Sequence, residues 1–104
     1  YCFNVVAKNS KTNAGAVLIR GIKPDKGITR MQKNRKIENL KELTNGPGKL
    51  TQSLEITKEH YGLDLTKKSK IYITEGIEIK KIIKSTRIGI KKGKEKLWNF
   101  KYSF

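Results

Sequence analysis

Alternating apolar and polar positions at the start of the chain predict a β-hairpin. The segment from Tyr1 to Ala7 presents its side chains to two faces in turn, which is the period of a β-strand. A polar turn over Lys8–Asn13 separates this segment from a second apolar run, Ala14–Ile22. Because the centre of the second run is apolar on both faces, we expect an interior strand that pairs antiparallel with the first.

The middle of the chain changes to a spacing of three or four residues, which predicts short helices. Asp25 can begin a helix whose apolar side contains Ile28 and Met31, and which gives way to a basic loop over Asn34–Lys36. Apolar residues three apart predict a further short helix within residues 37–43.

A third helix is expected to begin at Pro47 and to run to about residue 58. Proline fits the first helical position because its missing N–H costs nothing there, and a glycine precedes it as the cap. Leu50 and Leu54 give this helix an apolar stripe. The free N–H groups of the first turn, the positive end of the helix dipole and Lys49 together favour an anion such as phosphate. The other interpretation is a simple boundary between loop and helix with an exposed lysine.

The last third of the chain contains further strand patterns. Two strands are expected, at Lys70–Glu75 and Ser85–Ile90, while residues 77–83 are ambiguous between strand and helix. The clearest strand carries an aromatic residue at every second position: Trp98, Phe100, Tyr102 and Phe104. We expect this row to face the core, although a base-stacking platform stays open. The elements together predict an α+β fold, a mixed, mostly antiparallel β-sheet with short helices inserted between early and late strands.

The charge balance points to a polyanionic partner. The chain has 24 Lys and Arg against nine Asp and Glu, a formal net charge of +15, and twenty of the basic residues are lysines. Lysine makes phosphate contacts that hold without reading base sequence, so nucleic acid is the first candidate. The alternative is a coding bias toward Lys and Ile, which would raise the charge without any ligand.

A single cysteine and a single histidine limit the chemistry of the chain. Cys2 alone can form neither an internal disulfide nor a Cys-based zinc site, and one histidine argues against His-pair metal sites and a Ser-His-Asp triad. His60 lies in a polar segment and is expected to be solvated. No apolar run has the length of a membrane helix, so no membrane partner is expected, and the cysteine content favours a reducing intracellular location.

Four segments in this order and spacing resemble the alkyladenine (3-methyladenine) DNA glycosylase family: AGAVLIRGIKP, GITRMQKNR, NGPGKLTQSLEI and STRIGI. The resemblance runs from about residue 1 to residue 104, and its most specific parts are VLIRGIKP and GPGKLTQSLEI. It implies that residues 1–104 are the C-terminal portion of a single glycosylase domain whose N-terminal portion is absent from this sequence.

The resemblance implies a base-excision-repair enzyme. Such a monofunctional DNA glycosylase flips a damaged purine out of duplex DNA and hydrolyses its N-glycosidic bond. Family substrates include 3-methyladenine, 7-methylguanine, hypoxanthine and ethenoadenine. An alkylated purine is a good leaving group, and one activated water captures the oxocarbenium-like sugar, so no metal or cofactor is expected. The expected partner is double-stranded DNA with damaged purines, and the expected state is a monomer located inside the cell with the DNA, in nucleoid or nucleus.

Five positions match functional residues of the family. Asn4 matches the pocket asparagine that helps to exclude normal guanine. Arg20 matches the arginine that helps to place the attacking water, whereas the residues alone leave open a paired structural role for it. Ile88 matches the residue whose main-chain carbonyl contacts the same water. Lys49 and Lys58 match lysines that bind phosphates of the DNA backbone, which agrees with the anion site expected at Lys49.

The general base of the family has no counterpart among these residues. In the family, the glutamate that acts as this base, a neighbouring tyrosine and histidine, and the tyrosine wedged into the DNA stack all precede the segment that begins at Tyr1. A general base contributes ~10²–10⁴-fold, so we expect negligible turnover from these residues alone. The alternative hypothesis is a non-catalytic basic nucleic-acid-binding module or an inactive gene remnant, which would bind DNA or RNA without regard to lesions.

Overall fold

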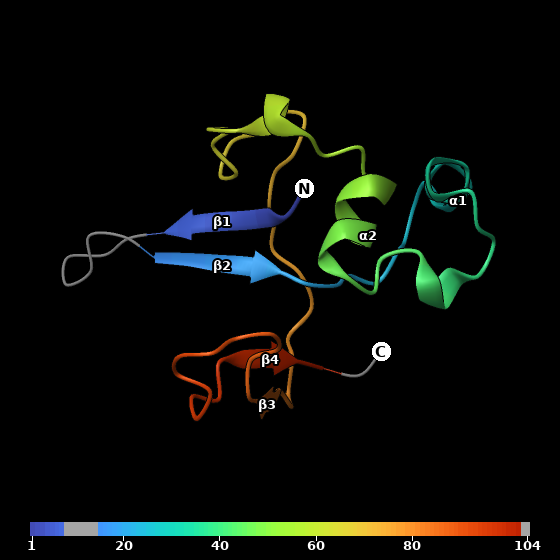
Figure 1. Cartoon of the computed structure of the whole chain (residues 1–104). Coiled ribbons are helices and arrows are strands. Elements are labelled where there is room, and N and C mark those ends of the chain that lie inside the picture. Colours follow the sequence, from blue (N-terminus) through green and yellow to red (C-terminus); the bar gives the residue numbers. More distant parts are fainter. Residues whose placement is uncertain (8–14, 103–104) are drawn as a thin grey trace. The chain divides into compact units, whose positions relative to one another are not determined.

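The computed structural model describes residues 1–7 and 15–102 and confirms the α+β fold. The chain forms two compact units, Tyr1–Tyr72 and Ile73–Phe104. In chain order, helices α1 (Ile28–Arg35) and α2 (Pro47–Ser53) lie between two antiparallel pairs of strands, which are separate two-stranded sheets (Figure 1). The predicted turn at residues 8–13, together with residues 14, 103 and 104, lies outside the described residues. A single domain over residues 1–104 stays a prediction.

The first two strands pair as the sequence predicts. Strand β1 (Phe3–Ala7) is antiparallel to β2 (Gly15–Ile19), and the register places Phe3 opposite Ile19. The expectation that the second strand lies in the interior is wrong, because Val17 at its centre is 60% exposed. Within the described residues β1 is the one partner strand of β2. A two-stranded sheet of this kind does not cover both faces of the apolar centre of β2.

A small core lies in the helical part of the N-terminal unit. Four hydrophobic side chains are buried there: Met31, Leu43, Leu50 and Ile56. Helix α1 begins after Gly27, which has a φ of 75°. It continues into the segment expected to be a basic loop, Asn34–Lys36, and ends at Arg35 with Lys36 as its C-cap. The cations of its last turn are favourable at the negative end of the helix dipole, which is why a basic segment remains helical here. A 3₁₀ helix, η1 (Leu40–Glu42), follows where a short helix is expected.

Helix α2 begins at Pro47 as predicted but ends earlier than expected, at Ser53. Leu50 is fully buried, whereas Leu54 lies at the C-cap and is 38% exposed, so the apolar stripe has one buried member. Beyond the helix, a second 3₁₀ helix, η2, covers Lys58–His60. His60 is not simply solvated, because its Nδ1 accepts a hydrogen bond of 3.0 Å from the backbone N–H of Thr57. Within the described residues, no helix has both the length and the apolar character needed to cross a membrane.

The C-terminal unit contains one short hairpin. Strand β3 (Ile83–Ser85) is antiparallel to β4 (Asn99–Lys101). The strand expected at Lys70–Glu75 is wrong, since that segment is irregular, and of Ser85–Ile90 only Ser85 lies in a strand. The latter segment turns instead, with Gly89 at a φ of 71°.

The aromatic row at the end of the chain does not face a core. Trp98 is 57% exposed and Phe100 is 58% exposed, so the prediction of a buried row is wrong for these two residues. The reason is the size of the sheet: among the described residues β4 has β3 as its single partner, and a two-stranded hairpin has too few neighbours to bury large rings.

Candidate nucleic-acid interface

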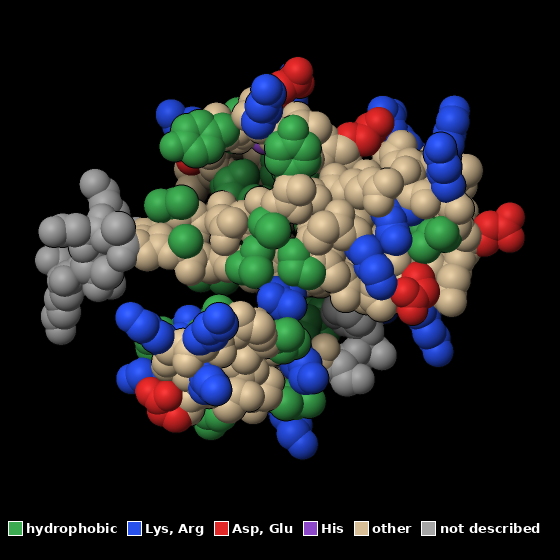
Figure 2. Space-filling model, in the orientation of Figure 1, with side chains coloured by type: hydrophobic (Ala, Val, Ile, Leu, Met, Phe, Trp, Pro, Cys, Tyr) green, Lys and Arg blue, Asp and Glu red, His purple; other side chains and the backbone are tan. Residues whose placement is uncertain are grey.

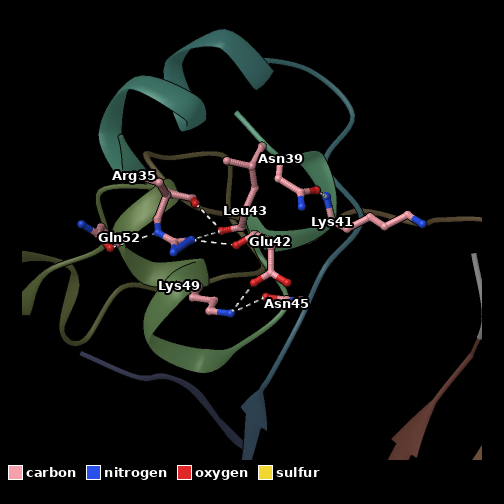
Figure 3. A network of polar contacts seen from close by, with 9 residues as sticks. Arg35, Asn39, Lys41, Glu42, Leu43, Asn45, Lys49 and Gln52 are labelled. Carbon is pink, nitrogen blue, oxygen red and sulfur yellow. Dashed lines mark hydrogen bonds and ion pairs between the residues drawn. The ribbon is translucent and has the colours of Figure 1, made fainter. Parts of the chain in front are cut away.

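Lys49 in the first turn of α2 is held by two neighbours. Its Nζ donates a hydrogen bond of 2.9 Å to Oε2 of Glu42 and one of 3.0 Å to Oδ1 of Asn45 (Figure 3). An ammonium group has three donors, so one remains for a further acceptor. The ammonium is thus fixed over the loop that precedes α2, and it remains partly exposed to solvent.

The ion pair between Glu42 and Lys49 changes the acidity of the carboxyl group. The hydrogen bond from Lys49 and then its positive charge lower the pKa of Glu42, against a smaller opposing effect of desolvation. The lysine expected to meet phosphate therefore already has an anionic partner in the free chain. Sequence reasoning did not select Glu42; the available signal was an acidic side chain seven residues before the lysine of a glycine-rich, basic segment.

Arg35 fixes the backbone from which Glu42 extends. Its Nη1 donates to the carbonyl oxygens of Glu42, at 2.8 Å, and Leu43, at 3.0 Å. Its Nε donates to Oε1 of Gln52 on α2, at 3.1 Å. Figure 3 shows this guanidinium reaching from the end of α1 toward the segment that carries Glu42. One arginine thus joins α1, η1 and α2, and through them it positions the partner of Lys49.

Arg20 and Asn4 lie at the same end of the N-terminal hairpin. The register pairs Asn4 with Leu18, and Arg20 follows directly after the end of β2. Asn4 is exposed rather than buried among apolar side chains, and Arg20 is partly exposed. Among the residues that the structure describes, the Arg20 guanidinium has no hydrogen-bond or ion-pair partner, and Asn4 does not bond to it. The roles of both residues stay predictions.

The segment after Arg20 is joined to the segment before α2. The backbone N–H of Ile22 donates to the carbonyl of Thr44 at 3.2 Å, and Oγ1 of Thr44 donates to the carbonyl of Ile22 at 2.7 Å. Before the start of β1, the carbonyl of Tyr1 accepts a hydrogen bond of 2.9 Å from Oγ1 of Thr51 in α2. The hairpin end that carries Arg20 is therefore tied to the element that carries Lys49.

The two remaining predicted residues lie elsewhere. Lys58 is exposed at the start of η2. Ile88 belongs to the C-terminal unit, where it lies in the turn before Gly89 with its side chain exposed. Because the expected role of Ile88 uses its main-chain carbonyl, exposure of the side chain does not bear on that role.

A hollow of about 200 Å³ lies between the start of α1 and the end of α2, away from the predicted residues. Its lining includes Lys26, Arg30 and Glu55, and the last two form an ion pair at 2.8 Å. Across residues 1–7 and 15–102, no three His, Cys, Asp or Glu side chains come together to hold a metal ion.

The chain is a small α+β protein with an arginine and a lysine presented from two elements that are hydrogen-bonded to each other. It belongs to the methylpurine-DNA glycosylase (MPG) family, whose model matches residues 1–103.

The chain is also similar to several bacterial proteins, each named "Putative 3-methyladenine DNA glycosylase". It is 44% identical over 97 residues to the protein of Prosthecochloris aestuarii, which covers 91% of this chain and 46% of the relative. It is 43% identical to the protein of Carboxydothermus hydrogenoformans, with 96% and 53% covered, and 44% identical to that of Ehrlichia chaffeensis, with 96% and 50% covered. The chain spans about half the length of these relatives. No solved structure matches it.

Proposed function

We propose that this chain is part of a base-excision-repair DNA glycosylase that hydrolyses the N-glycosidic bond of alkylated or deaminated purines. The proposed substrate is a damaged purine flipped out of double-stranded DNA, and the protein acts on it as a monomer without a cofactor. Family membership over residues 1–103 supports a glycosylase, and the basic surface suits a DNA backbone.

In the proposed reaction, the bond between C1′ of the sugar and the purine nitrogen breaks, and its electron pair leaves with the base. A water oxygen then bonds to C1′, which yields a free purine and an abasic sugar. We assign to Arg20 the placement of this water by hydrogen bonding, together with the main-chain carbonyl of Ile88 as an acceptor. Asn4 is assigned to the base pocket, where it disfavours normal guanine.

The observation that carries the proposal is the setting of Arg20. A partly exposed guanidinium without a partner among the described residues stands at a strand end. The segment that follows it is joined by the bonds between Ile22 and Thr44 to the element that bears Lys49. A structural arginine is normally paired, so an unpaired one beside a backbone segment that is hydrogen-bonded to Thr44 suits a group outside the chain.

The proton of the attacking water also needs an acceptor. None of the acidic residues in this chain matches the general-base glutamate of the family. We therefore propose that residues 1–104 alone bind DNA but turn over negligibly, and that activity belongs to a protein that also supplies this base.

The experiment that tests the proposal measures release of hypoxanthine or ethenoadenine from duplex DNA by the whole protein that contains this chain. Arg20→Ala should slow single-turnover excision strongly. Arg30→Ala is the matched control, because it removes an exposed arginine of the same unit that pairs with Glu55 instead. Excision by Arg20→Ala at the wild-type rate would reject the assigned role. Binding that ignores lesions, with no excision by the whole protein, would favour the non-catalytic module.

A further inference from the structure

Lys49 is engaged at two of its three donors before any ligand arrives. Its Nζ lies 2.9 Å from Oε2 of Glu42 and 3.0 Å from Oδ1 of Asn45. A lysine without such partners is a flexible point charge whose whole positive charge is offered to solvent or to a ligand. The ammonium of Lys49 instead has an anion of its own chain in contact with it, so its charge is already balanced in the free protein.

Glu42 is anchored through its backbone. It closes the 3₁₀ helix η1, where its N–H donates to the carbonyl of Asn39 at 3.1 Å, and its own carbonyl accepts a bond of 2.8 Å from Nη1 of Arg35 in α1. The carbonyl of the next residue, Leu43, accepts a bond of 2.6 Å from the hydroxyl of Ser53 in α2. The carboxylate therefore extends from a backbone that hydrogen bonds join to both helices.

The Glu42 carboxyl group is stabilised in its charged form. The hydrogen bond from Lys49, and then its charge, lower the pKa of Glu42, and the charge of Arg35 acts in the same direction. The side chains of Lys49 and Glu42 are 40% and 49% exposed. An ion pair with this much access to water is weak enough for one of its partners to be exchanged for another anion.

Carboxylates are scarce in this chain, yet one of them lies on the lysine that is assigned to a phosphate. The chain has 24 Lys and Arg against nine Asp and Glu, and in Figure 2 the blue basic side chains are spread over the surface with few red acidic ones among them. Across residues 1–7 and 15–102, the lysines that pair with a carboxylate are Lys49, with Glu42, and Lys67, with Asp64. Lys58, the other lysine assigned to the DNA backbone, has no carboxylate partner within those ranges.

We propose that Glu42 competes with DNA for Lys49 and so weakens the contact between this lysine and a backbone phosphate. The inference rests on the proposed function, from which it takes the role of Lys49, and it gives Glu42 a role that the proposed reaction does not contain. A phosphate that reaches the third donor of Lys49 lies near the Glu42 carboxylate, and two like charges repel at such a separation. A phosphate that takes the place of Glu42 must first break the ion pair. By either route the duplex is bound less tightly than by an unpaired lysine.

The opposite interpretation is that Glu42 and Asn45 orient Lys49 toward the phosphate and thereby strengthen the contact. Glu42→Gln separates the two effects. The glutamine has the same length and keeps an amide oxygen that can accept from Lys49, whereas the negative charge is gone. Competition therefore predicts tighter binding of DNA by this variant, and orientation predicts unchanged or weaker binding.

The test measures binding of a labelled, undamaged duplex by the whole protein that contains this chain. At low salt, Glu42→Gln should bind about three- to tenfold more tightly than wild type. The gain should shrink as salt rises, because the repulsion that it removes is screened. Glu38→Gln is the matched control, since it removes the same charge four residues earlier from an exposed carboxylate that pairs with no cation among the described residues. Equal gains for the two variants, or no gain for Glu42→Gln, would overturn the inference.

A second comparison asks whether the effect of Glu42 passes through Lys49. In a Lys49→Gln background, Glu42→Gln should increase affinity no more than Glu38→Gln does. A full gain in that background would show that Glu42 acts on DNA directly and would reject competition for the lysine. Circular dichroism establishes that each variant is folded, and partial unfolding would lower affinity, so it cannot imitate the expected gain.

The outcome for Glu42 can be distinguished from the outcome for the proposed function. Excision of a damaged purine by the same protein, without tighter binding by Glu42→Gln, would reject this inference alone. If Lys49→Gln binds the duplex as tightly as wild type does, the lysine makes no phosphate contact and the inference fails with it, whereas the excision measurement still decides whether the protein is a glycosylase. Absence of excision together with the Lys49-dependent gain would reject the glycosylase and leave the competition established.

Discussion

Thr44 and Ile22 are joined by two hydrogen bonds, one from the backbone of Ile22 and one from the Thr44 hydroxyl. The two residues are 22 positions apart in sequence, and Thr44 is almost fully buried. Ile22 follows the strand end that carries Arg20, and Thr44 precedes the helix that carries Lys49. This contact therefore determines how the proposed water-placing arginine is connected to the proposed phosphate-binding lysine.

Thr44→Val should weaken this connection. The change keeps the size and branching of the side chain but leaves the Ile22 carbonyl without the hydroxyl donor, so the free energy of unfolding should fall by about 1–3 kcal/mol. Urea denaturation measures the loss. Thr29→Val on the exposed side of α1 is the control, and it should change stability by no more than about 0.5 kcal/mol. Equal losses for the two variants would contradict a special role for Thr44.

Arg35→Gln should destabilise the N-terminal unit more than Arg30→Gln does. Arg35 donates to the carbonyls of Glu42 and Leu43 and to the amide oxygen of Gln52. The Leu43 carbonyl keeps its bond from the Ser53 hydroxyl, but the other two acceptors lose their donor, and we expect about 1–3 kcal/mol. Arg30 forms an ion pair whose partners are both largely exposed, which contributes about 0–1 kcal/mol. Thermal or urea unfolding of the two variants compares them directly, and the reverse order would show that the Arg35 network is not a principal connection.

Lys49→Ala should weaken binding to duplex DNA irrespective of damage. Loss of one phosphate contact lowers the slope of log K against log salt by about 0.9. Titration of labelled duplexes with and without a lesion, at several salt concentrations, measures this slope. Lys41→Ala is a suitable control because Lys41 is an exposed lysine on η1. Weaker binding confined to damaged DNA would contradict a phosphate role for Lys49.

The Glu42–Lys49 pair should make the free energy of unfolding fall as the pH is lowered. Because the pKa of Glu42 is lowered in the folded chain, the pair stabilises it fully above the carboxyl pKa of the unfolded chain. That stabilisation disappears as pH falls through the lowered folded pKa. Glu42→Gln should therefore destabilise the chain at neutral pH and lose this effect in acid.

Urea denaturation at neutral and at acidic pH measures the effect of Glu42→Gln on the free energy of unfolding. A background of Lys49→Gln provides the control, since the ammonium responsible for the lowered pKa is then missing. A pH dependence of the Glu42→Gln effect that is unchanged in this background would assign it to another group.

Local rules predicted the elements whose cause lies within a few residues. The start of α2 at Pro47 follows from the geometry of proline, and the pairing of β1 with β2 follows from two strand patterns joined by a polar turn. The helix start at Pro47 selected Lys49, and the family resemblance agreed with it and assigned a role to Arg20. Neither of them selected Glu42 or Arg35, because their positions depend on contacts between elements rather than on a motif.

The elements that sequence reasoning placed wrongly are those whose burial depends on neighbours. An apolar or aromatic run predicts a buried strand only if other strands cover it. Val17 and Trp98 instead lie on two-stranded sheets and are exposed. Leu54 matched the helical spacing, yet the helix ended one residue before it.

The sequence by itself determined the α+β class, the positive charge, the helix start at Pro47 and the family, because each of these depends on composition or on residues adjacent in the chain. Only the tertiary structure decided that Thr44 is hydrogen-bonded to Ile22 and that Glu42 forms an ion pair with Lys49. It also decided that the Arg87 guanidinium lies beside the Trp98 ring. These contacts join residues whose separation along the chain has no fixed relation to their distance in space. They form where packing of the helices or closure of a hairpin brings complementary groups together.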